Sequence, residues 1–312
     1  MRIDVAPVDP KRVTILGFGL MGSQISQVFS QQGYEVLAYD VNKERLENGL
    51  SIVRAGRYGL ENAIAKGRLD SPKAREILNR IETTTSLDYA LAGAEFVVEA
   101  AVEDLSTKQG LFSRACALAA KDAVLASNTS TLSIAKISDS LPLEGKRRVV
   151  GMHFFNPPQV MKLVEVVRSS ESAPEAVERV RSVSKRLGKV PIVVNDQPGF
   201  VANRIGLSVF AEASDLLQKG VASIRDIDIA MRLGYGYPLG PFELGDLVGL
   251  DSRLLNMEAM YRETGDERFK PPEILRKIVS EGYLGDQKIR KGSKGGYYEY
   301  FGLKRPSDPE GE

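Results

Sequence analysis

A single histidine and one acidic residue are the side chains of this 312-residue chain best suited to acid–base chemistry. His153 stands in the run Gly-Met-His-Phe-Phe-Asn-Pro-Pro, and histidine is the side chain whose unperturbed pKa lies nearest neutral pH. Glu165 follows in an apolar run, flanked by Val164 and Val166, where a carboxylate is costly to bury unless it is paired. A His153–Glu165 pair would fix the imidazole tautomer and stabilise the imidazolium formed when the base accepts a proton.

Both residues also have a purely structural explanation. A lone histidine beside two phenylalanines at a strand end is most often a hydrogen-bonded residue of the core. Glu165 could instead point outward, or pair with Lys162 or Arg168. The helices and strands that position these two side chains therefore decide whether their role is catalytic or structural.

A glycine-rich turn near the start of the chain indicates a dinucleotide site. An apolar run at 13–16 precedes the turn, an amphipathic stretch at 23–32 follows it, and a second apolar run occupies 35–39. In such a unit the three glycines permit the tight turn, the approach of the pyrophosphate and close helix packing, whereas isolated glycines also serve ordinary turns. Free N–H groups at the helix start favour phosphate. The predicted cofactor contacts of the turn are Gly17, Phe18, Gly19, Leu20, Met21 and Gly22.

Asp40, at the end of the second apolar run, indicates which nicotinamide cofactor is bound. A carboxylate here can hydrogen-bond the adenine ribose hydroxyls and would repel a 2′-phosphate. Val41 and Asn42 provide no arginine that would reverse this preference. We therefore predict NAD as the cofactor, and hydride chemistry as the reaction in which His153 removes a proton from an alcohol.

The succession of apolar runs predicts an α/β fold. Helical patterns separate most of these runs, which is typical of a largely parallel sheet covered by helices. We predict a Rossmann-type, mostly parallel sheet with a second, all-helical C-terminal domain. The further strand-like runs are 96–99, 124–127, 149–152, 163–167 and 190–194.

The character of the chain changes at the Pro198-Gly199 break, beyond which we expect helices and no strand. We predict a NAD-binding domain over residues 1–196 and a helical substrate and dimerisation domain over 197–312. Residues 43–80 are unusually long for a connection between neighbouring strands, so we expect a charged helical excursion there. The expected helices of the second domain include 200–219, 225–233 and 272–281.

Two further polar segments are candidates for the same site. Residues 127–130 (Ser-Asn-Thr-Ser) close a predicted strand and supply hydroxyls at its edge. They could also cap a helix starting near Leu132, and both roles can hold at once. Asn203 opens the helical domain and could reach back across an interdomain cleft towards the substrate, although alone it would be read as an exposed helix residue.

The composition excludes several other classes of function. A net charge of +1 argues against a general electrostatic hold on nucleic acid or membrane. Cys116 is the only cysteine, which excludes an intrachain disulfide and fits a reducing compartment; its helical pattern suggests a packed small residue. No apolar run reaches the ~18 residues needed to span a membrane, and the N-terminus has no signal-peptide core. We expect a cytoplasmic protein without a metal site, with a flexible arm over its first dozen residues and a disordered tail from Pro306.

Taken together, these segments resemble the L-3-hydroxyacyl-CoA dehydrogenase family, in particular the bacterial 3-hydroxybutyryl-CoA dehydrogenase type. The resemblance runs from about Arg12 to Tyr300. The segments that carry it, in chain order, are 17–22, 98–103, 127–130, 153–157, 161–166, 198–204 and 236–243.

The resemblance implies reversible, NAD-dependent oxidation of an (S)-3-hydroxyacyl-CoA to the 3-oxoacyl-CoA, in fatty-acid β-oxidation or butanoate-type metabolism. It makes His153 the catalytic base and Glu165 its acidic partner, with Ser127 and Asn203 bonded to the substrate oxygen and the histidine network. It implies a homodimer formed through the C-terminal domain. The implied cofactor contacts are Asp40, Glu103, Lys108, Ser127 and Asn156.

The family also places coenzyme A near the helical excursion, where this chain carries Arg54 and Arg57 as candidate substrate contacts. One departure concerns the segment 284–298, which is a few residues longer than the family's short Lys-Thr-Gly connection. Its lysines, Lys288, Lys291 and Lys294, are all candidates to approach the cofactor, and we select Lys291 among them.

Three alternatives compete with this reading. β-Hydroxyacid dehydrogenases use a lysine base on an interdomain helix, but the corresponding segment 198–204 contains no lysine. Gulonate-type dehydrogenases share the histidine motif and act on free sugar acids, yet their motif lacks the Phe-Phe that follows His153 here. A non-catalytic NAD-binding protein would have no need of the combination of His153, Glu165, Ser127 and Asn203.

Overall fold

The computed structural model describes residues 10–306, which form two compact units, one ending at Phe200 and one beginning at Val201. Most of the expected N-terminal arm and of the expected tail falls on residues 1–9 and 307–312, outside the described residues; Arg12 already belongs to the first strand. None of the described helices is long and apolar enough to cross a membrane.

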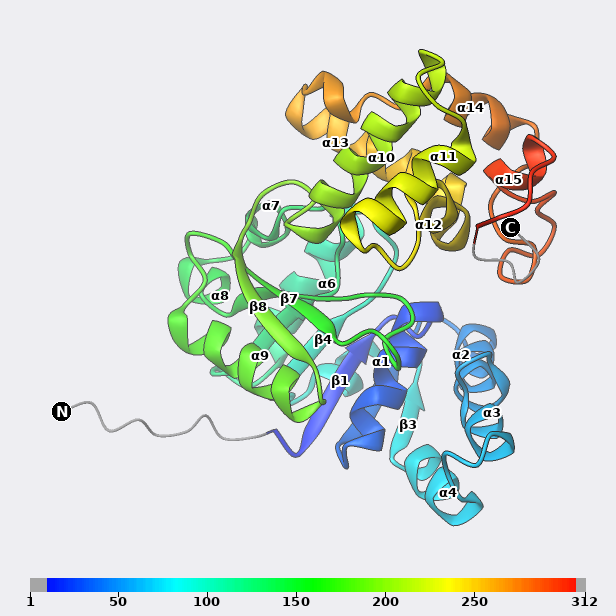
Figure 1. Cartoon of the computed structure of the whole chain (residues 1–312). Coiled ribbons are helices and arrows are strands. Elements are labelled where there is room, and N and C mark those ends of the chain that lie inside the picture. Colours follow the sequence, from blue (N-terminus) through cyan, green and yellow to red (C-terminus); the bar gives the residue numbers. More distant parts are fainter. Residues whose placement is uncertain (1–9, 307–312) are drawn as a thin grey trace. The chain divides into compact units, whose positions relative to one another are not determined.

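The first unit is built on a mixed sheet whose eight strands lie in the order β3-β2-β1-β4-β5-β6-β7-β8. Several of these strands are labelled in Figure 1. All neighbouring strands pair in parallel except β6 and β7, which are antiparallel. The predicted mostly parallel, Rossmann-type sheet is therefore confirmed. The strands are β1 Arg12–Leu16, β2 Glu35–Tyr39, β3 Ile81–Thr84, β4 Phe96–Glu99, β5 Val124–Ser127, β6 Val149–Phe154, β7 Leu163–Arg168 and β8 Val190–Asn195.

Two strands differ from the sequence-based expectation. Strand β3 was not predicted, because its sequence Ile-Glu-Thr-Thr buries only Ile81 and so has no apolar run. Strand β6 continues two residues beyond the expected 149–152, so His153 lies within the strand rather than after it. All six residues of β6 are buried, and the pairing of His153 and Phe154 with β7 extends the strand to Phe154.

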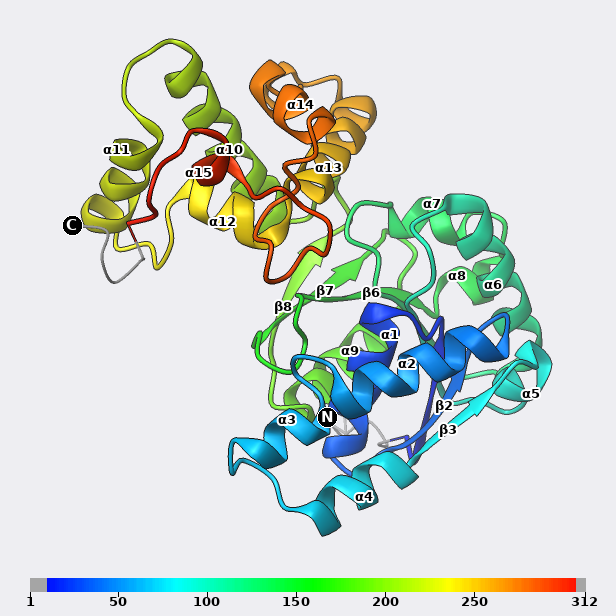
Figure 2. The same cartoon turned by 90° about the vertical axis from the view of Figure 1, so that its right-hand side faces the viewer.

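Helices cover both faces of the sheet. Three of them, α2, α3 and α4, follow β2 and form the expected charged excursion, which Figure 2 shows as one blue-to-cyan group. Asn42 caps α2 by accepting a hydrogen bond from the Arg45 backbone, and Asp70 caps α4 in the same way. The helices are α1 Leu20–Gln31, α2 Lys43–Ala55, α3 Leu60–Ala65, α4 Ser71–Asn79, α5 Leu87–Leu91, α6 Leu105–Leu118, α7 Ile134–Ser138, α8 Leu143–Lys146 and α9 Pro174–Arg186.

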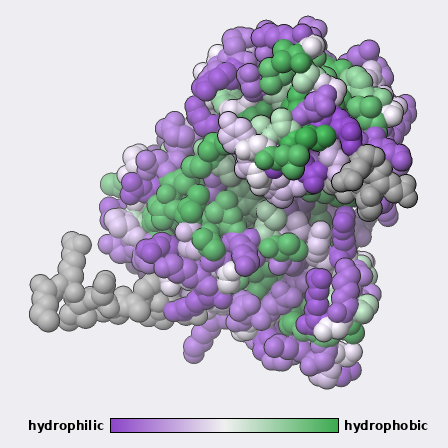
Figure 3. Space-filling view, viewed as in Figure 1, coloured by the Kyte–Doolittle hydropathy of each residue, from purple (hydrophilic) through white to green (hydrophobic). Residues whose placement is uncertain are grey.

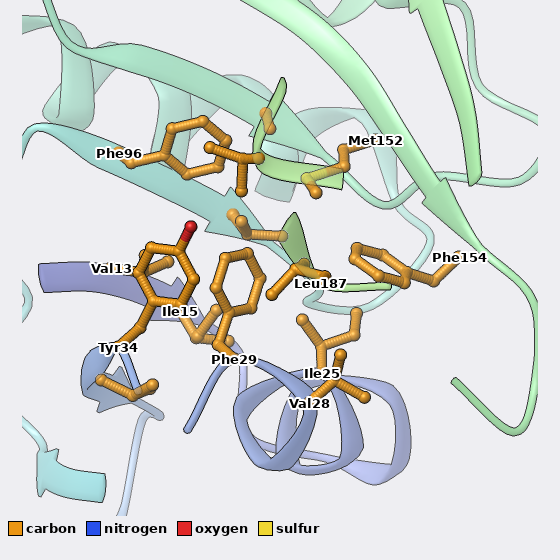
Figure 4. Close-up of a cluster of buried hydrophobic side chains, with 14 of the residues drawn as sticks. Val13, Ile15, Ile25, Val28, Phe29, Tyr34, Phe96, Met152, Phe154 and Leu187 are labelled. Carbon is orange, nitrogen blue, oxygen red and sulfur yellow. The ribbon is translucent and has the colours of Figure 1, made fainter. Parts of the chain in front are cut away.

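An apolar core between the sheet and helices α1 and α9 holds helix α1, and with it the glycine turn, against the sheet. Ile25, Val28 and Phe29 of α1 point into this core towards Phe96 and Met152 of the sheet (Figure 4). Burying a side chain such as Phe29, which is 0% exposed, contributes about 2 kcal/mol. The start of α1 is thereby held rigidly against the ends of the central strands.

The surface of the first unit that Figure 3 shows is hydrophilic around its margins, and apolar residues gather in one patch over the region of strand β8. Strand β8 is an outer strand of the sheet and exposes Val190 and Val193. Cys116 of α6 is partly buried, and its backbone carbonyl and Sγ both accept from the Arg148 guanidinium, which fits a packed structural residue.

The second unit is helical, as predicted; within its described residues the only strand-like pairing is an isolated bridge between Gly285 and Gly295. Helices α12 and α13 lie outside the three helical segments that were named in advance for this domain. The helices are α10 Ala202–Gln218, α11 Ile224–Ile229 with a π-helical extension Ala230–Gly234, α12 Pro241–Val248, α13 Leu250–Thr264, α14 Glu273–Ser280 and α15 Tyr297–Tyr300, with a short 3₁₀ turn at Glu267–Phe269.

Two buried aspartates connect the helices of the second unit. Asp228 of α11 accepts hydrogen bonds from the backbone N–H groups of Phe242 and Glu243 and from the Tyr298 hydroxyl. Asp246 of α12 accepts from the Tyr297 backbone at 2.7 Å. Burial raises the pKa of Asp228 to about 6 and that of Asp246 to about 7, against the opposing effect of these hydrogen bonds.

Candidate active site

The sheet gathers the candidate residues of the first unit at one edge. Strands β1, β4, β5 and β6 run in the same direction, so their carboxyl ends meet at the edge where open α/β sheets bind ligands. The register sets Glu99 opposite Ser127, and Ser127 opposite Gly151. The glycine turn leaves β1 at the same edge.

His153 and Glu165 are direct cross-strand partners of the antiparallel pair β6–β7. The Nδ1 atom of His153 lies 2.8 Å from Oε2 of Glu165, with the histidine 5% exposed and the glutamate 0% exposed. The rings of Phe155 and Phe200 flank the imidazole, with centroids at 4.5 and 5.7 Å. Because the carboxylate engages Nδ1, the other ring nitrogen, Nε2, is left to exchange a proton with a ligand.

This geometry removes the simplest structural alternative for Glu165. The carboxylate is fully buried against an imidazole, so it does not point outward. Arg168, offered as another partner, lies at the exposed end of β7 and donates from Nε to Asn195 at 2.9 Å. The apolar run around Glu165 thus marked a paired carboxylate.

Glu99 forms a second buried carboxylate network, and the sequence analysis gave this residue no role of its own. It is 0% exposed and accepts hydrogen bonds from the Ser127 hydroxyl at 2.6 Å and the Ala101 backbone at 2.7 Å. Lys108 reaches the same carboxylate at 2.6 Å. The signal that identified Glu165, an acid within an apolar strand, was equally present at Glu99 in Phe-Val-Val-Glu.

Glu103 continues this network on the loop after β4. Its Oε1 accepts from the Thr129 hydroxyl at 2.6 Å and from the Ser130 backbone at 3.0 Å, while Oε2 lies 3.2 Å from Nζ of Lys108. Burial alone would raise the pKa of Glu103, but the charge of Lys108 and these hydrogen bonds outweigh it and lower the pKa.

The segment 127–130 therefore organises carboxylates rather than capping a helix. Helix α7 begins at Ile134, and its cap is Ser133, whose side chain accepts from the Lys136 backbone. The helix cap expected at 127–130 is supplied by Ser133 instead, while Thr129 stabilises the turn before the helix by accepting from the Leu132 backbone at 2.9 Å. Asn128 has a further task that the sequence did not reveal: its Oδ1 accepts from the Phe154 backbone at 2.9 Å, directly beside His153.

The glycine turn has the steric features required for a dinucleotide. Gly17 has φ of +92°, and a Cβ there would lie 2.7 Å from the Ala101 backbone nitrogen. A Cβ at Gly22 would lie 1.9 Å from the Gly17 carbonyl oxygen, whereas one at Gly19 would meet nothing within 4 Å. The outer two glycines thus allow close packing of the protein itself, and the middle one leaves open space where a phosphate can approach. Gly19 also begins α1 without a side-chain cap.

Asp40 holds the turn in shape. Its Oδ2 accepts from the Phe18 backbone at 2.8 Å and its Oδ1 from the Val41 backbone at 2.7 Å. The carboxylate is 6% exposed and stands directly after β2, the place expected for a ribose-binding acid.

A cavity of about 490 Å³ lies between the glycine turn and helix α2. This volume is within the range of ligand pockets, and its walls combine backbone, amide and charged groups suited to a nucleotide. Its lining residues are Phe18, Gly19, Asn42, Glu44, Arg45, Asn48, Gly49 and Ile52.

The remaining predicted residues lie in different surroundings. Asn156, two residues after β6, is exposed, as are Arg54 near the end of α2 and Arg57 in the turn that follows. Asn203 in the first turn of α10 and Lys291 in the segment after α14 belong to the second unit. Their parts in the site stay predictions.

Comparison with known proteins gives a consistent result over both units. Residues 12–197 match the family model of the 3-hydroxyacyl-CoA dehydrogenase NAD binding domain, and residues 199–300 match that of the 3-hydroxyacyl-CoA dehydrogenase C-terminal domain. A probable 3-hydroxybutyryl-CoA dehydrogenase of Bacillus subtilis is 37% identical over 290 residues, which are 93% of this chain and 97% of that protein.

Two further relatives agree. The 3-hydroxybutyryl-CoA dehydrogenase of Clostridioides difficile is 36% identical over 93% of this chain and 99% of its own length. Among solved structures, (S)-3-hydroxybutyryl-CoA dehydrogenase PaaH1 from Ralstonia eutropha superposes with a TM-score of 0.82 at 35% identity, covering 91% of this chain and 99% of that one.

Proposed function

Because the chain belongs to the 3-hydroxyacyl-CoA dehydrogenase family, we propose that it reversibly oxidises (S)-3-hydroxyacyl-CoA to 3-oxoacyl-CoA with His153 as general base. That it is an NAD-dependent dehydrogenase of hydroxyacyl-CoA compounds follows from the family. The stereochemistry, the base and a place in fatty-acid β-oxidation or butanoate-type metabolism are the proposal. The observation that carries it is the buried His153–Glu165 pair, with 2.8 Å between Nδ1 and Oε2.

In this mechanism His153 takes the hydroxyl proton of the substrate at Nε2. Bound NAD would accept the hydride that leaves the carbon bearing this hydroxyl group. The imidazolium that forms faces Glu165, which is buried and positioned before the reaction, so no solvent reorganisation is needed to stabilise the new charge. Phe155 and Phe200 shield this pair from water.

Ser127 serves the site through Glu99. Its hydroxyl donates to Glu99 and accepts from the Thr129 backbone at 3.2 Å, so one lone pair of the oxygen is left to accept from a ligand, for example from a carboxamide N–H. Donation from Ser127 to the substrate oxygen would require breaking that 2.6 Å bond. We therefore assign the substrate oxygen to His153 and, as a proposal, to Asn203.

The residues of the first unit fit NAD. The open space at Gly19 and the uncapped start of α1 suit its pyrophosphate, and Asp40 suits its ribose. We propose Glu103, Asn156 and Lys291 as further cofactor contacts. Lys108, which is 1% exposed, would act by holding Glu99 and Glu103 in place.

Acyl-CoA is the substrate consistent with the family, and its phosphates require cations. Arg54 and Arg57 present exposed guanidinium groups on the excursion, and we propose that they meet the coenzyme A part. We further propose a cytoplasmic homodimer formed through the second unit, which exposes large apolar side chains such as Leu233 and Tyr235.

The direct test is NADH formation with short-, medium- and long-chain (S)-3-hydroxyacyl-CoA substrates and with L-gulonate. We expect NADH with the thioesters and none with gulonate. NADH with gulonate alone would favour the gulonate-type alternative, and NAD binding without turnover of either substrate would favour a non-catalytic protein.

A further inference from the structure

A loop of eight residues, 155–162, connects β6 to β7 directly after the strand that carries His153, and two buried side chains from other elements, Lys189 and Gln27, hold it. Lys189, which is 9% exposed and precedes β8, donates its ammonium to the carbonyl of Pro158 and, at 3.0 Å, to that of Met161. Gln159, within the loop, donates from Nε2 to Oε1 of Gln27 at 3.0 Å. The loop is therefore fixed both to the sheet and to helix α1.

Gln27 extends this connection to the helical excursion. It is 1% exposed, and its own Nε2 donates to the backbone carbonyl of Tyr58 at 3.0 Å. Tyr58 lies in the turn between α2 and α3, and the guanidinium of Arg57 stands over its ring at 5.7 Å. Two amides thus join the turn that carries Arg57 to the loop that follows the catalytic histidine.

The polar character of this link is costly for the fold. Oε1 of Gln159 is buried and accepts no hydrogen bond, and Oε1 of Gln24, one helical turn before Gln27, is in the same state. An apolar side chain at position 159 would avoid this buried, unsatisfied acceptor. Because this buried acceptor costs stability, we attribute to Gln159 a positional role that its hydrogen bond to Gln27 provides.

We propose that Gln27 and Gln159 are positioning residues that couple the excursion to the reacting loop. Binding of the coenzyme A part at Arg57 fixes the turn at Tyr58, the two amides pass this constraint to loop 155–162, and His153 and Asn156 are held in their productive positions. Binding energy from the remote part of the substrate is thereby used at the reacting carbon. This inference rests on the proposed acyl-CoA function and adds to it the residues that transmit substrate recognition.

The test compares two substrates of the same chemistry. One is (S)-3-hydroxybutyryl-CoA, and the other is the corresponding N-acetylcysteamine thioester, which lacks the nucleotide and phosphates. For Gln27→Leu and Gln159→Leu we expect the ratio of the two kcat/KM values to fall about fivefold or more, the size of one buried hydrogen bond, with the loss mainly in kcat for the CoA substrate. The double variant should lose no more than either single variant, because both residues act in one chain of contacts.

Two control variants separate coupling from simple support of the loop. Lys189→Met removes the other anchor and should slow both substrates alike, leaving their ratio unchanged. Gln32→Leu changes an exposed glutamine at the end of the same helix and should have no effect. If Gln27→Leu fails to fold, Gln159→Leu, which lies in a partly exposed loop, carries the test.

An unchanged ratio in folded Gln159→Leu would overturn the coupling while leaving the proposed function intact. A wild-type protein that binds NAD but oxidises neither thioester would overturn the proposed function itself, and the coupling with it.

Discussion

Both units bury carboxylates, but they balance the negative charge in different ways. At the sheet edge of the first unit, Glu165 faces an imidazole and Glu99 faces the ammonium of Lys108. In the helical unit, Asp228 is held by backbone N–H groups and a tyrosine hydroxyl, and Asp246 by backbone N–H groups with Arg305 only at 3.5 Å. The pairing of carboxylates with an imidazole or an ammonium suits a reaction in which a positive charge forms on the imidazole. The hydrogen-bonded aspartates of the helical unit connect helices, and their burial destabilises the ionised carboxylate.

The pKa directions agree with this contrast. The pKa of Glu103 is lowered because Lys108 and several donors outweigh its burial. The pKa of Asp246 is raised to about 7 because burial outweighs its hydrogen bonds and Arg305. Glu103 is thus kept ionised, whereas burial favours the protonated form of Asp228 and Asp246.

Replacing Glu165 by glutamine should have the largest effect on activity among the carboxylates. The amide keeps the size of the side chain but cannot stabilise the imidazolium, so we expect kcat to fall by about 10²–10⁴-fold with NAD binding retained. Steady-state kinetics and NAD titration measure this. Glu175→Gln, at an exposed position of α9, serves as the control, and an equal loss there would show that the effect is unspecific.

Replacing Glu99 by glutamine should mainly weaken the fold of the first unit. It removes the carboxylate closest to the buried Lys108 and loosens Ser127, so we expect a loss of about 3–5 kcal/mol in the free energy of unfolding, as for other broken buried ion pairs. Urea denaturation with and without NAD checks the value. A variant as stable as the parent would contradict the view that this carboxylate is needed as a charge.

The raised pKa of Asp246 should make the stability of the helical unit depend on pH. The pKa of Asp246 rises from 3.8 to about 7 on folding, so the folded state binds its proton more tightly. The stabilisation from this proton is fully present below about pH 4 and is lost as the pH rises through about 7. Asp246→Asn removes this loss, so the stability of the variant relative to the parent should improve steadily between these limits.

Thermal denaturation of both proteins across that pH range measures the trend. The decisive quantity is the slope of the stability difference between Asp246→Asn and the parent against pH. The amide also loses one backbone hydrogen bond, which lowers the stability of the variant by the same amount at every pH. Asp226→Asn, at an exposed position of α11, should leave the slope of the parent unchanged. A flat difference between Asp246→Asn and the parent would contradict the raised pKa.

The smallest effect is expected for Tyr298→Phe. The change removes the hydroxyl that donates to Asp228 at 2.7 Å, at a cost of about 1 kcal/mol in unfolding free energy. Because Tyr298 lies in the core of the helical unit, kcat should stay at the parent value. A large loss of kcat with normal stability would show that this cluster takes part in the reaction.

The sequence predicted the sheet, the helical excursion and the His153–Glu165 pair because these features have strong local signals. Apolar runs, three glycines and an acid within an apolar strand are readable one segment at a time. Strand β3 has no such run, since only Ile81 is buried. Glu99 carried the same signal as Glu165 and was overlooked because no single residue type, such as a lone histidine, drew attention to a partner.

Other features depend on contacts that no local pattern contains. Gln27 and Gln159 meet across 132 positions of the chain, and Asp246 meets Tyr297 across 51. Their roles appear only when the fold brings them together. The extension of β6 through His153 is a similar case, because the strand is prolonged by pairing with β7 rather than by its own apolar residues.

The most direct test of the central claim is the turnover of His153→Gln. Because His153 is the only histidine, no other imidazole can replace it. We predict that kcat with (S)-3-hydroxybutyryl-CoA falls by about 10²–10⁴-fold, the usual contribution of a general base, while the dissociation constant for NAD stays at the parent value. A folded, NAD-binding variant with near-parental kcat would contradict the assignment of His153 as the base.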